Sequence, residues 1–168
     1  RIQQKLAKEL QSAWRKCAKD CQLKTPAEAL ILASIIEKET GKSSEREHVS
    51  GVFHNRLRLE MPLQSDPTVS YGVTLGNFIL RRPLSRTDLQ TASPFNTYLN
   101  KGLPPRPISN PGLAAIRAAM MPKKTKDIYF VADGRGGHAF SKTLLEHNRN
   151  VAKWRSLQRK ANRKNIRN

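Results

Sequence analysis

Four of the thirteen acidic residues lie within eleven positions of one another, in a chain where basic residues outnumber acidic ones by 31 to 13. They are Glu37, Glu39, Glu45 and Glu47. Glu45 and Glu47 are expected in the first turn of a helix, where a negative charge is favourable, so helix capping accounts for both. Glu37 and Glu39 are expected at the end of another helix, where the helix dipole opposes a negative charge. We therefore look for chemistry first at this second pair.

Helical spacing separates the two carboxyl groups of that pair. The residues three, four and seven positions before Glu39 are Ile36, Ile35 and Leu32, whereas those before Glu37 are Ser34, Ala33 and Leu30. Glu39 is therefore the carboxyl expected to lose contact with water, and this burial raises its pKa toward neutrality. A carboxyl that is still protonated near neutral pH is the general acid that glycosidic bond cleavage requires. The alternative is a solvated last helical turn shared with Lys38.

Other chemistries find little support in the sequence. Gly41-Lys42-Ser43 resembles the end of a phosphate-binding loop, but that loop needs glycine where this chain has Ile36. The glycines at 134–137 lie between two expected strands, so they indicate a hairpin turn rather than a dinucleotide site. Cys17 and Cys21 share an apolar helical stripe and are interpreted as packing residues, with their redox state left open. No histidine lies at a metal-binding distance from them in sequence, so we expect no metal and no cofactor.

Periodicity and capping signals outline a mainly helical chain. We expect an amphipathic helix over residues 2–21, a buried helix that begins after Thr25 and stops at Gly41, and a helix that begins with a capping box at 44–47. We expect a loop at 62–68, a short helix after Ser85, a stiff extended segment at 102–107 and a helix from Asn110-Pro111 to Met120. Two strands, 127–132 and 138–140, form a hairpin, and Thr143 caps a final helix. The fold class is therefore α+β with an excess of helix.

The net charge of +18 is concentrated at the two ends of the chain. Residues 1–24 hold seven basic residues against two acidic ones, and residues 149–168 hold eight against none, while residues 25–148 hold sixteen against eleven. A polyanionic partner is therefore indicated mainly at the ends. A nucleic-acid-binding module is one hypothesis. Aromatic residues make up only 6% of the chain and do not alternate with the basic runs, which counts against it.

An ordered set of motifs over residues 26–155 resembles the endolytic murein transglycosylases of the MltG (YceG-like) family. The motifs are ASIIEKET at 33–40, SER at 44–46, VFHNRL at 52–57, LQSDPTVSYG at 63–72, NTY at 96–98, GLPP at 102–105, YFVADG at 129–134, and Gly137-His138 with Phe140. In that family the second glutamate of Glu-Lys-Glu-Thr is the catalytic one, which corresponds to Glu39. This is the residue that the burial argument favours independently.

The resemblance implies a helix-rich catalytic domain like those of lysozymes and lytic transglycosylases, with a small β-hairpin. It would occupy residues 25–155, between a basic amphipathic helix at 1–24 and a basic tail at 156–168. The implied reaction cleaves the β-1,4 bond between N-acetylmuramic acid and N-acetylglucosamine within a peptidoglycan strand and leaves a 1,6-anhydromuramoyl end. Glu39 would protonate the leaving oxygen and then take the proton of the muramoyl 6-hydroxyl. A second carboxylate is then unnecessary.

Supporting roles follow from the same motifs. The residues expected to bind the sugar strand are Gln64, Ser65, Asp66, Thr68, Tyr71, Asn96, Thr97 and Tyr98. Those expected to support the site are Glu37, Asn55, Arg56 and His138. Asp66 could equally be a turn former, and His138 is more readily explained as structural. The expected partner is the glycan strand, with peptidoglycan synthases and an anionic membrane surface as further candidates and no nucleic acid.

The family also carries an N-terminal transmembrane helix and a LysM-like domain outside these motifs. The resemblance therefore implies the catalytic part of a bacterial inner-membrane protein that faces the periplasm. Two features depart from the family pattern: Arg106 follows Gly-Leu-Pro-Pro where a small residue is usual, and residues 73–83 match no motif. Two alternatives remain beside nucleic-acid binding: a hydrolytic muramidase that uses Asp66 as its second carboxylate, and a wall-binding scaffold without turnover.

Overall fold

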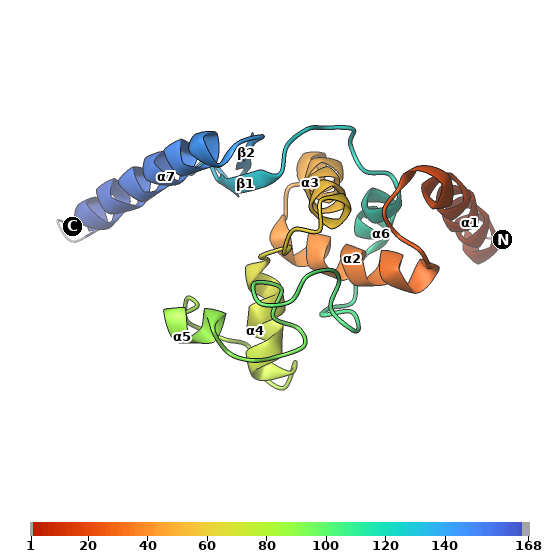
Figure 1. The fold of residues 1–168 in the computed structure, drawn as a ribbon, viewed down its shortest axis with the longest axis horizontal. Coiled ribbons are helices and arrows are strands. Elements are labelled where there is room, and N and C mark those ends of the chain that lie inside the picture. Colours follow the sequence, from red (N-terminus) through yellow and green to blue (C-terminus); the bar gives the residue numbers. More distant parts are fainter. Residues whose placement is uncertain (1, 166–168) are drawn as a thin grey trace.

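The computed structural model describes residues 2–165 of the chain, and it is mainly helical (Figure 1). The elements, in chain order, are α1 (Ile2–Asp20), α2 (Pro26–Glu39), the 3-10 turn η1 (Ser43–Glu45), α3 (Arg46–Arg58), α4 (Asp66–Thr74), α5 (Arg86–Leu89), α6 (Leu113–Met120), β1 (Tyr129–Ala132), β2 (His138–Ser141) and α7 (Leu144–Asn165). The predicted helix-rich α+β class with a small hairpin is confirmed.

Helix α2 lies at the centre of the fold and packs against α6, α3 and α4 (Figure 1). Leu32, Ala33, Ile35 and Ile36 are fully buried, as expected of a helix that is apolar on nearly every side. Ala115 and Ala119 of α6 are also fully buried, and their small side chains allow the two helices to approach closely. Glu39 is the last residue of α2 and therefore lies at the edge of this core.

Helix α1 packs on this core. Ala13, Cys17 and Leu23 are buried, and Leu10 and Trp14 lie against the same cluster. Cys17 and Cys21 form a disulfide, which the sequence did not predict. The expectation that Cys17 is a packing residue is nevertheless confirmed, because its side chain is only 2% exposed.

Two predicted helix ends differ from the structure. The Thr25 hydroxyl accepts the Glu28 N–H at 3.2 Å as expected, but α2 stops at Glu39 because Thr40 is extended (φ −140°, ψ 127°), one residue before Gly41. The capping box predicted at 44–47 is wrong, since Glu45 immediately precedes α3 and makes no side-chain cap. Its carboxylate instead contacts His138.

The predicted loop at 62–68 is wrong in its second half. Helix α4 begins at Asp66 with Pro67 in its first turn, a position where the missing N–H of proline costs nothing. Two of its three buried residues are threonines (Thr68 and Thr74, with Val69), so the sequence shows no clear apolar stripe. Helix α6 likewise begins at Leu113 rather than at Asn110. The capping box that opens α5 at Ser85 is confirmed.

The predicted hairpin and the final helix are confirmed. Strands β1 and β2 are antiparallel, with Tyr129 opposite Ser141 and Ala132 opposite His138. Helix α7 packs on both strands and then extends away from the domain, so that the two ends of the chain lie at opposite ends of the molecule (Figure 1). It runs through residue 155 without a break. The hairpin therefore stands between the helical core and α7.

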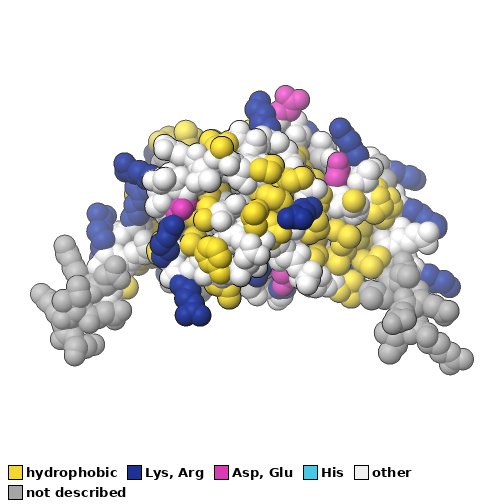
Figure 2. Space-filling model, turned by 90° about the horizontal axis from the view of Figure 1, so that it is seen from below, with side chains coloured by type: hydrophobic (Ala, Val, Ile, Leu, Met, Phe, Trp, Pro, Cys, Tyr) yellow, Lys and Arg dark blue, Asp and Glu magenta, His cyan; other side chains and the backbone are white. Residues whose placement is uncertain are grey.

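None of the helices within residues 2–165 is both long and apolar enough to cross a membrane. Figure 2 shows the face seen from below in Figure 1, with hydrophobic side chains gathered near its middle and Lys and Arg side chains dispersed around them. On this face the basic residues do not form one continuous patch. The surplus of positive charge is thus no guide to a single binding surface there.

Candidate active site

The carboxyl group of Glu39 lies at the end of the buried helix α2. Burial raises its pKa from the ordinary 4.5 to about 7, and the nearby negative charge of Asp66 acts in the same direction. A hydrogen bond from Ser65 and the positive charge of Arg56 oppose this shift without cancelling it. Near neutral pH the group is therefore present both as an acid and as a carboxylate, as proton transfer in both directions requires.

Ser65 holds this carboxyl directly. Its hydroxyl donates to Glu39 Oε1 at 2.5 Å, although Ser65 is the residue before α4, where a serine hydroxyl would ordinarily cap the helix. Two buried threonines fix the Ser65 backbone: Thr97 Oγ1 accepts its N–H at 3.0 Å, and Thr68 Oγ1 donates to its carbonyl at 2.7 Å. The two threonine hydroxyls also share a hydrogen bond of 2.7 Å. This cluster positions Ser65 against Glu39.

Arg56 brings positive charge close to Glu39 from α3. Its Nε donates to the Ile128 carbonyl at 2.7 Å, and its Nη1 donates to the carbonyls of Pro62 and Leu63 and to Gln64 Oε1 at 3.0 to 3.1 Å. The guanidinium therefore ties α3 to the residue just before β1 and to the segment that precedes α4. Gln64 itself is exposed and adopts a left-handed backbone conformation, with a φ of 52°.

Asp66 and Tyr98 form a second polar pair near Glu39. The Tyr98 hydroxyl donates to Asp66 Oδ1 at 2.6 Å. Burial is the main reason that the pKa of Tyr98 lies above its ordinary value, and the hydrogen bond to Asp66 adds to it. The tyrosine therefore stays a hydrogen-bond donor over the physiological pH range.

Glu45 holds His138 through two contacts. The His138 ring Nδ1 lies 2.8 Å from Glu45 Oε2, and the His138 N–H donates to Glu45 Oε1 at 3.2 Å. Lys42 Nζ lies 3.2 Å from the same Oε1. Burial alone would raise the pKa of Glu45, but these partners hold it below its ordinary value, so Glu45 is a carboxylate. Sequence reasoning missed this role because the partner lies 93 residues away.

Glu39 lies between two hollows. One, of about 490 Å³, is lined by Glu39 together with Arg56, Gln64, Asp66, Tyr98, Phe130, Val131, His138 and His147, among others. The other, of about 380 Å³, is lined by Glu39, Thr40, Gly41, the glycines of the hairpin turn, His138 and Trp154. Both volumes fall in the range typical of ligand pockets. The arrangement presents one titrating carboxyl to two adjoining spaces.

Several of the residues predicted for the site make contacts that support the fold. The Asn96 side chain is 1% exposed and donates to the carbonyls of Leu89 and Thr91, and Tyr71 packs edge-on against Phe95. Asn55 Nδ2 donates to the carbonyls of Thr125 and Asp127. Glu37 accepts the Gly112 N–H at 3.1 Å, at the start of α6. Like Thr68 and Thr97, the polar side chains of Asn96, Asn55 and Glu37 form hydrogen bonds within the fold.

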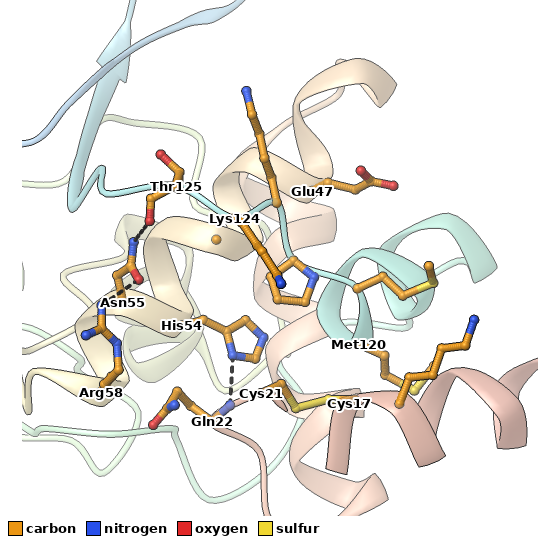
Figure 3. Close-up of a pocket in the computed structure, with 15 residues that line it drawn as sticks. Cys17, Cys21, Gln22, Glu47, His54, Asn55, Arg58, Met120, Lys124 and Thr125 are labelled. Carbon is orange, nitrogen blue, oxygen red and sulfur yellow. Dashed lines mark hydrogen bonds between the residues drawn. A yellow bond between two sulfur atoms is a disulfide. The ribbon is translucent and has the colours of Figure 1, made fainter. Parts of the chain in front are cut away.

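A further cavity, of about 530 Å³, lies beside the disulfide (Figure 3). The His54 ring contacts it, but both ring nitrogens are engaged: Nδ1 accepts the Gln22 N–H at 3.1 Å, and Nε2 donates to the Ala119 carbonyl at 2.8 Å. Burial lowers the pKa of His54, which keeps the ring neutral. Within residues 2–165, no group of three or more acidic, histidine or cysteine side chains is arranged to hold a metal ion. We therefore place the candidate active site at Glu39.

Comparison with known proteins identifies the class. Residues 1–153 match the YceG-like family, and the chain belongs to that family. It is 44% identical over 125 residues to an endolytic murein transglycosylase of Bacillus subtilis (strain 168), and 39% identical over 130 residues to one of Streptococcus pneumoniae serotype 2. These alignments cover 74% and 76% of this chain but only 34% and 24% of the two relatives, so the chain corresponds to about a third or less of their length.

A solved structure supports the same assignment. A YceG-like protein from Listeria monocytogenes is 45% identical and superposes with a TM-score of 0.65, covering 73% of this chain and 38% of its own. The family resemblance inferred from the motifs is thereby confirmed.

Proposed function

We propose that this chain is the catalytic part of an endolytic murein transglycosylase, in which Glu39 is the catalytic residue. The observation that carries the proposal is a carboxyl with a pKa of about 7, held by Ser65 and open to two adjoining hollows. The relatives that bear this name share 39 to 44% of the aligned residues. The substrate is a peptidoglycan glycan strand.

The reaction needs one proton carrier. Protonated Glu39 gives its proton to the oxygen that bridges N-acetylmuramic acid and N-acetylglucosamine, and the bond from the muramoyl anomeric carbon to that oxygen breaks. The Glu39 carboxylate then takes the proton of the muramoyl 6-hydroxyl as its oxygen attacks the same carbon. A new C1–O6 bond closes the 1,6-anhydro ring, and Glu39 ends protonated. No water is consumed, so atoms and protons balance within the strand.

The neighbours of Glu39 support this cycle. Because Ser65 donates to Oε1, it favours the carboxylate form and fixes the orientation of the group, leaving Oε2 to carry the transferred proton. Arg56 contributes a positive charge that stabilises the carboxylate once it has given up its proton. Gln64, Asp66 and Tyr98 line the 490 Å³ hollow and offer donors and acceptors to one sugar of the strand.

The family resemblance extends the proposal to the whole protein. Residues 25–155 form the catalytic domain, of the lysozyme and lytic-transglycosylase type, and residues 1–24 and 156–168 flank it. The protein acts at the bacterial inner membrane, with this part on the periplasmic side. Its cleavage there terminates nascent glycan strands. Peptidoglycan synthases and anionic lipid are the further partners proposed, the latter for the basic flanks.

The test is digestion of purified murein strands followed by mass spectrometry of the products. The proposal expects fragments that end in 1,6-anhydromuramic acid. Fragments with a reducing muramic acid end, heavier by one water, would instead support hydrolysis with Asp66 as second carboxylate, whose position in the same hollow as Glu39 makes it the second candidate mechanism. Binding without any fragment would support a scaffold.

A further inference from the structure

None of the proposed proton transfers uses the smaller hollow beside Glu39. Three residues, Glu39, Ala132 and His138, line both this 380 Å³ hollow and the 490 Å³ one, so the two meet at the catalytic carboxyl. A strand that is cut internally has sugars on both sides of the broken bond. If one sugar lies toward Asp66 and Tyr98, its neighbour must lie on the other side of Glu39, which is where the smaller hollow is.

The wall of this hollow is a braced turn. Asp133 donates its N–H to the Gly137 carbonyl at 2.9 Å, and its Oδ1 accepts the N–H groups of Arg135 and Gly137 at 2.7 and 3.0 Å. A Cβ at Gly137 would lie only 2.5 Å from Glu45 Oε1, so glycine is required for the carboxylate to reach this turn. The hydrogen bonds between His138 and Glu45 join the end of this turn to η1.

Glu45, in η1, determines how His138 presents its ring. A carboxylate can only accept hydrogen bonds, so the ring nitrogen that faces Glu45, Nδ1, carries the proton. In the neutral ring the other nitrogen, Nε2, is then an acceptor. Within residues 2–165 Nε2 has no hydrogen-bond partner, while the residue lines both hollows. In its neutral form, the ring therefore presents an oriented acceptor where the two hollows meet.

We propose that the hollow between Glu39 and the hairpin turn is a second sugar subsite, in which His138 Nε2 accepts a hydrogen bond from a hydroxyl or acetamido N–H group of an N-acetylhexosamine. Glu45 is a positioning residue that acts through His138. Trp154 of α7 supplies an apolar wall beside the bare backbone of the glycines. This inference rests on the proposed function and adds the site for the sugar on the second side of the bond.

A steric block at Gly41 tests the subsite. Gly41 lines the hollow, its φ is not positive, and a Cβ there would meet nothing within 4 Å, so a large side chain can be placed without strain in the fold. In a Glu39→Gln background, Gly41→Trp should weaken binding of a murein hexasaccharide at least tenfold, as measured by calorimetry. Ser43→Trp, an equally bulky change two residues away at an exposed position outside both hollows, should leave the Kd unchanged.

The histidine pair is tested in the active protein. His138→Phe keeps a planar ring and removes the acceptor, so KM for murein strands should rise five- to tenfold while kcat changes less than twofold. Glu45→Gln should raise KM in the same way, and the double variant should be no worse than His138→Phe, because both changes remove one interaction. A lowered Tm with an unchanged KM would show that the pair is only structural.

These outcomes distinguish two failures. If the unchanged protein releases no anhydromuramoyl product from murein, the proposed function fails. If it does release that product, while Gly41→Trp binds the hexasaccharide as tightly as Ser43→Trp and His138→Phe keeps its KM, this inference alone is overturned.

Discussion

The cleft at Glu39 and the cavity beside the disulfide are similar in size, at about 490 and 530 Å³, but their polar groups differ in what they are free to do. In the disulfide cavity, backbone groups engage both ring nitrogens of His54, and the Asn55 carboxamide is bonded at both ends. At Glu39 a single side-chain hydroxyl holds one carboxyl oxygen. A hollow is thus a candidate for chemistry when a buried group that lines it can still exchange a proton.

Changing a glutamate to glutamine should abolish most of the turnover in one cavity and leave it almost unchanged in the other. Glu39→Gln removes the proton carrier, so kcat should fall about 10²- to 10⁴-fold, the range for a lost general acid or base. Glu47→Gln changes an exposed carboxylate that lines the disulfide cavity, and turnover should stay within a factor of two. Rates of release of anhydromuramoyl fragments measure both. Full turnover by Glu39→Gln would remove Glu39 from the mechanism.

The dependence of stability on pH should be the next largest difference. The pKa of Glu39 is about 7 in the folded protein and near 4.5 when unfolded, so between these values the folded state holds a proton that the unfolded chain has lost. This group therefore favours the folded state most below about pH 4.5. As the pH rises from there to about 7, its contribution to the free energy of unfolding falls by about 3 kcal/mol. Urea unfolding of the unchanged protein and of Glu39→Gln, each at pH 5 and pH 8, measures it.

The amide variant supplies the control for that prediction, because it cannot titrate. Its free energy of unfolding should lack this component and exceed that of the unchanged protein at pH 8. Parallel pH curves for the two proteins would contradict the burial of the Glu39 carboxyl.

On the other side of the comparison, the disulfide should matter for stability and not for turnover. It closes a loop of about five residues at the end of α1, for which chain entropy gives about 2 kcal/mol. Cys21→Ser breaks the bond and leaves Cys17 in the core, so the urea midpoint should fall while kcat and KM stay unchanged. A loss of turnover in a variant that is still folded would link this cavity to the active site.

The smallest expected effect is at Ser65. Ser65→Ala removes the hydrogen bond that favours the Glu39 carboxylate, so the pKa of Glu39 should rise further. One such bond is worth about 1 kcal/mol, which corresponds to an upward shift of about 0.7 pH units in the alkaline limb of kcat. The pH profile of turnover measures it, with Ser43→Ala as the matched exposed control. A shift in the opposite direction would show that Ser65 acts in another way.

Local patterns predicted the parts of the fold that depend on neighbouring residues. The cap at Thr25, the buried run before Glu39, the hairpin and the cap at Thr143 all follow from residues within a few positions of one another, and all are present. The start of α4 was missed because its first turn looks like a polar loop and its buried residues are too few to show a period. The role of Glu45 was also missed. The local sequence suggested helix capping, whereas its carboxylate contacts a histidine 93 residues away.

Helical spacing alone predicts that Glu39 is more desolvated than Glu37, because it fixes which side chains lie beneath each of the two glutamates. The sequence also carried the ordered motifs of the family. The polar residues that surround that carboxyl depend on how the chain packs in three dimensions. Arg56 reaches the cleft from α3 and His138 from β2, while Ser65 reaches Glu39 from the segment before α4. Which hydroxyls and amides bond to backbone groups depends on contacts between residues far apart in the chain. Hydrogen-bond geometry in three dimensions, which has no local sequence signal, makes that choice.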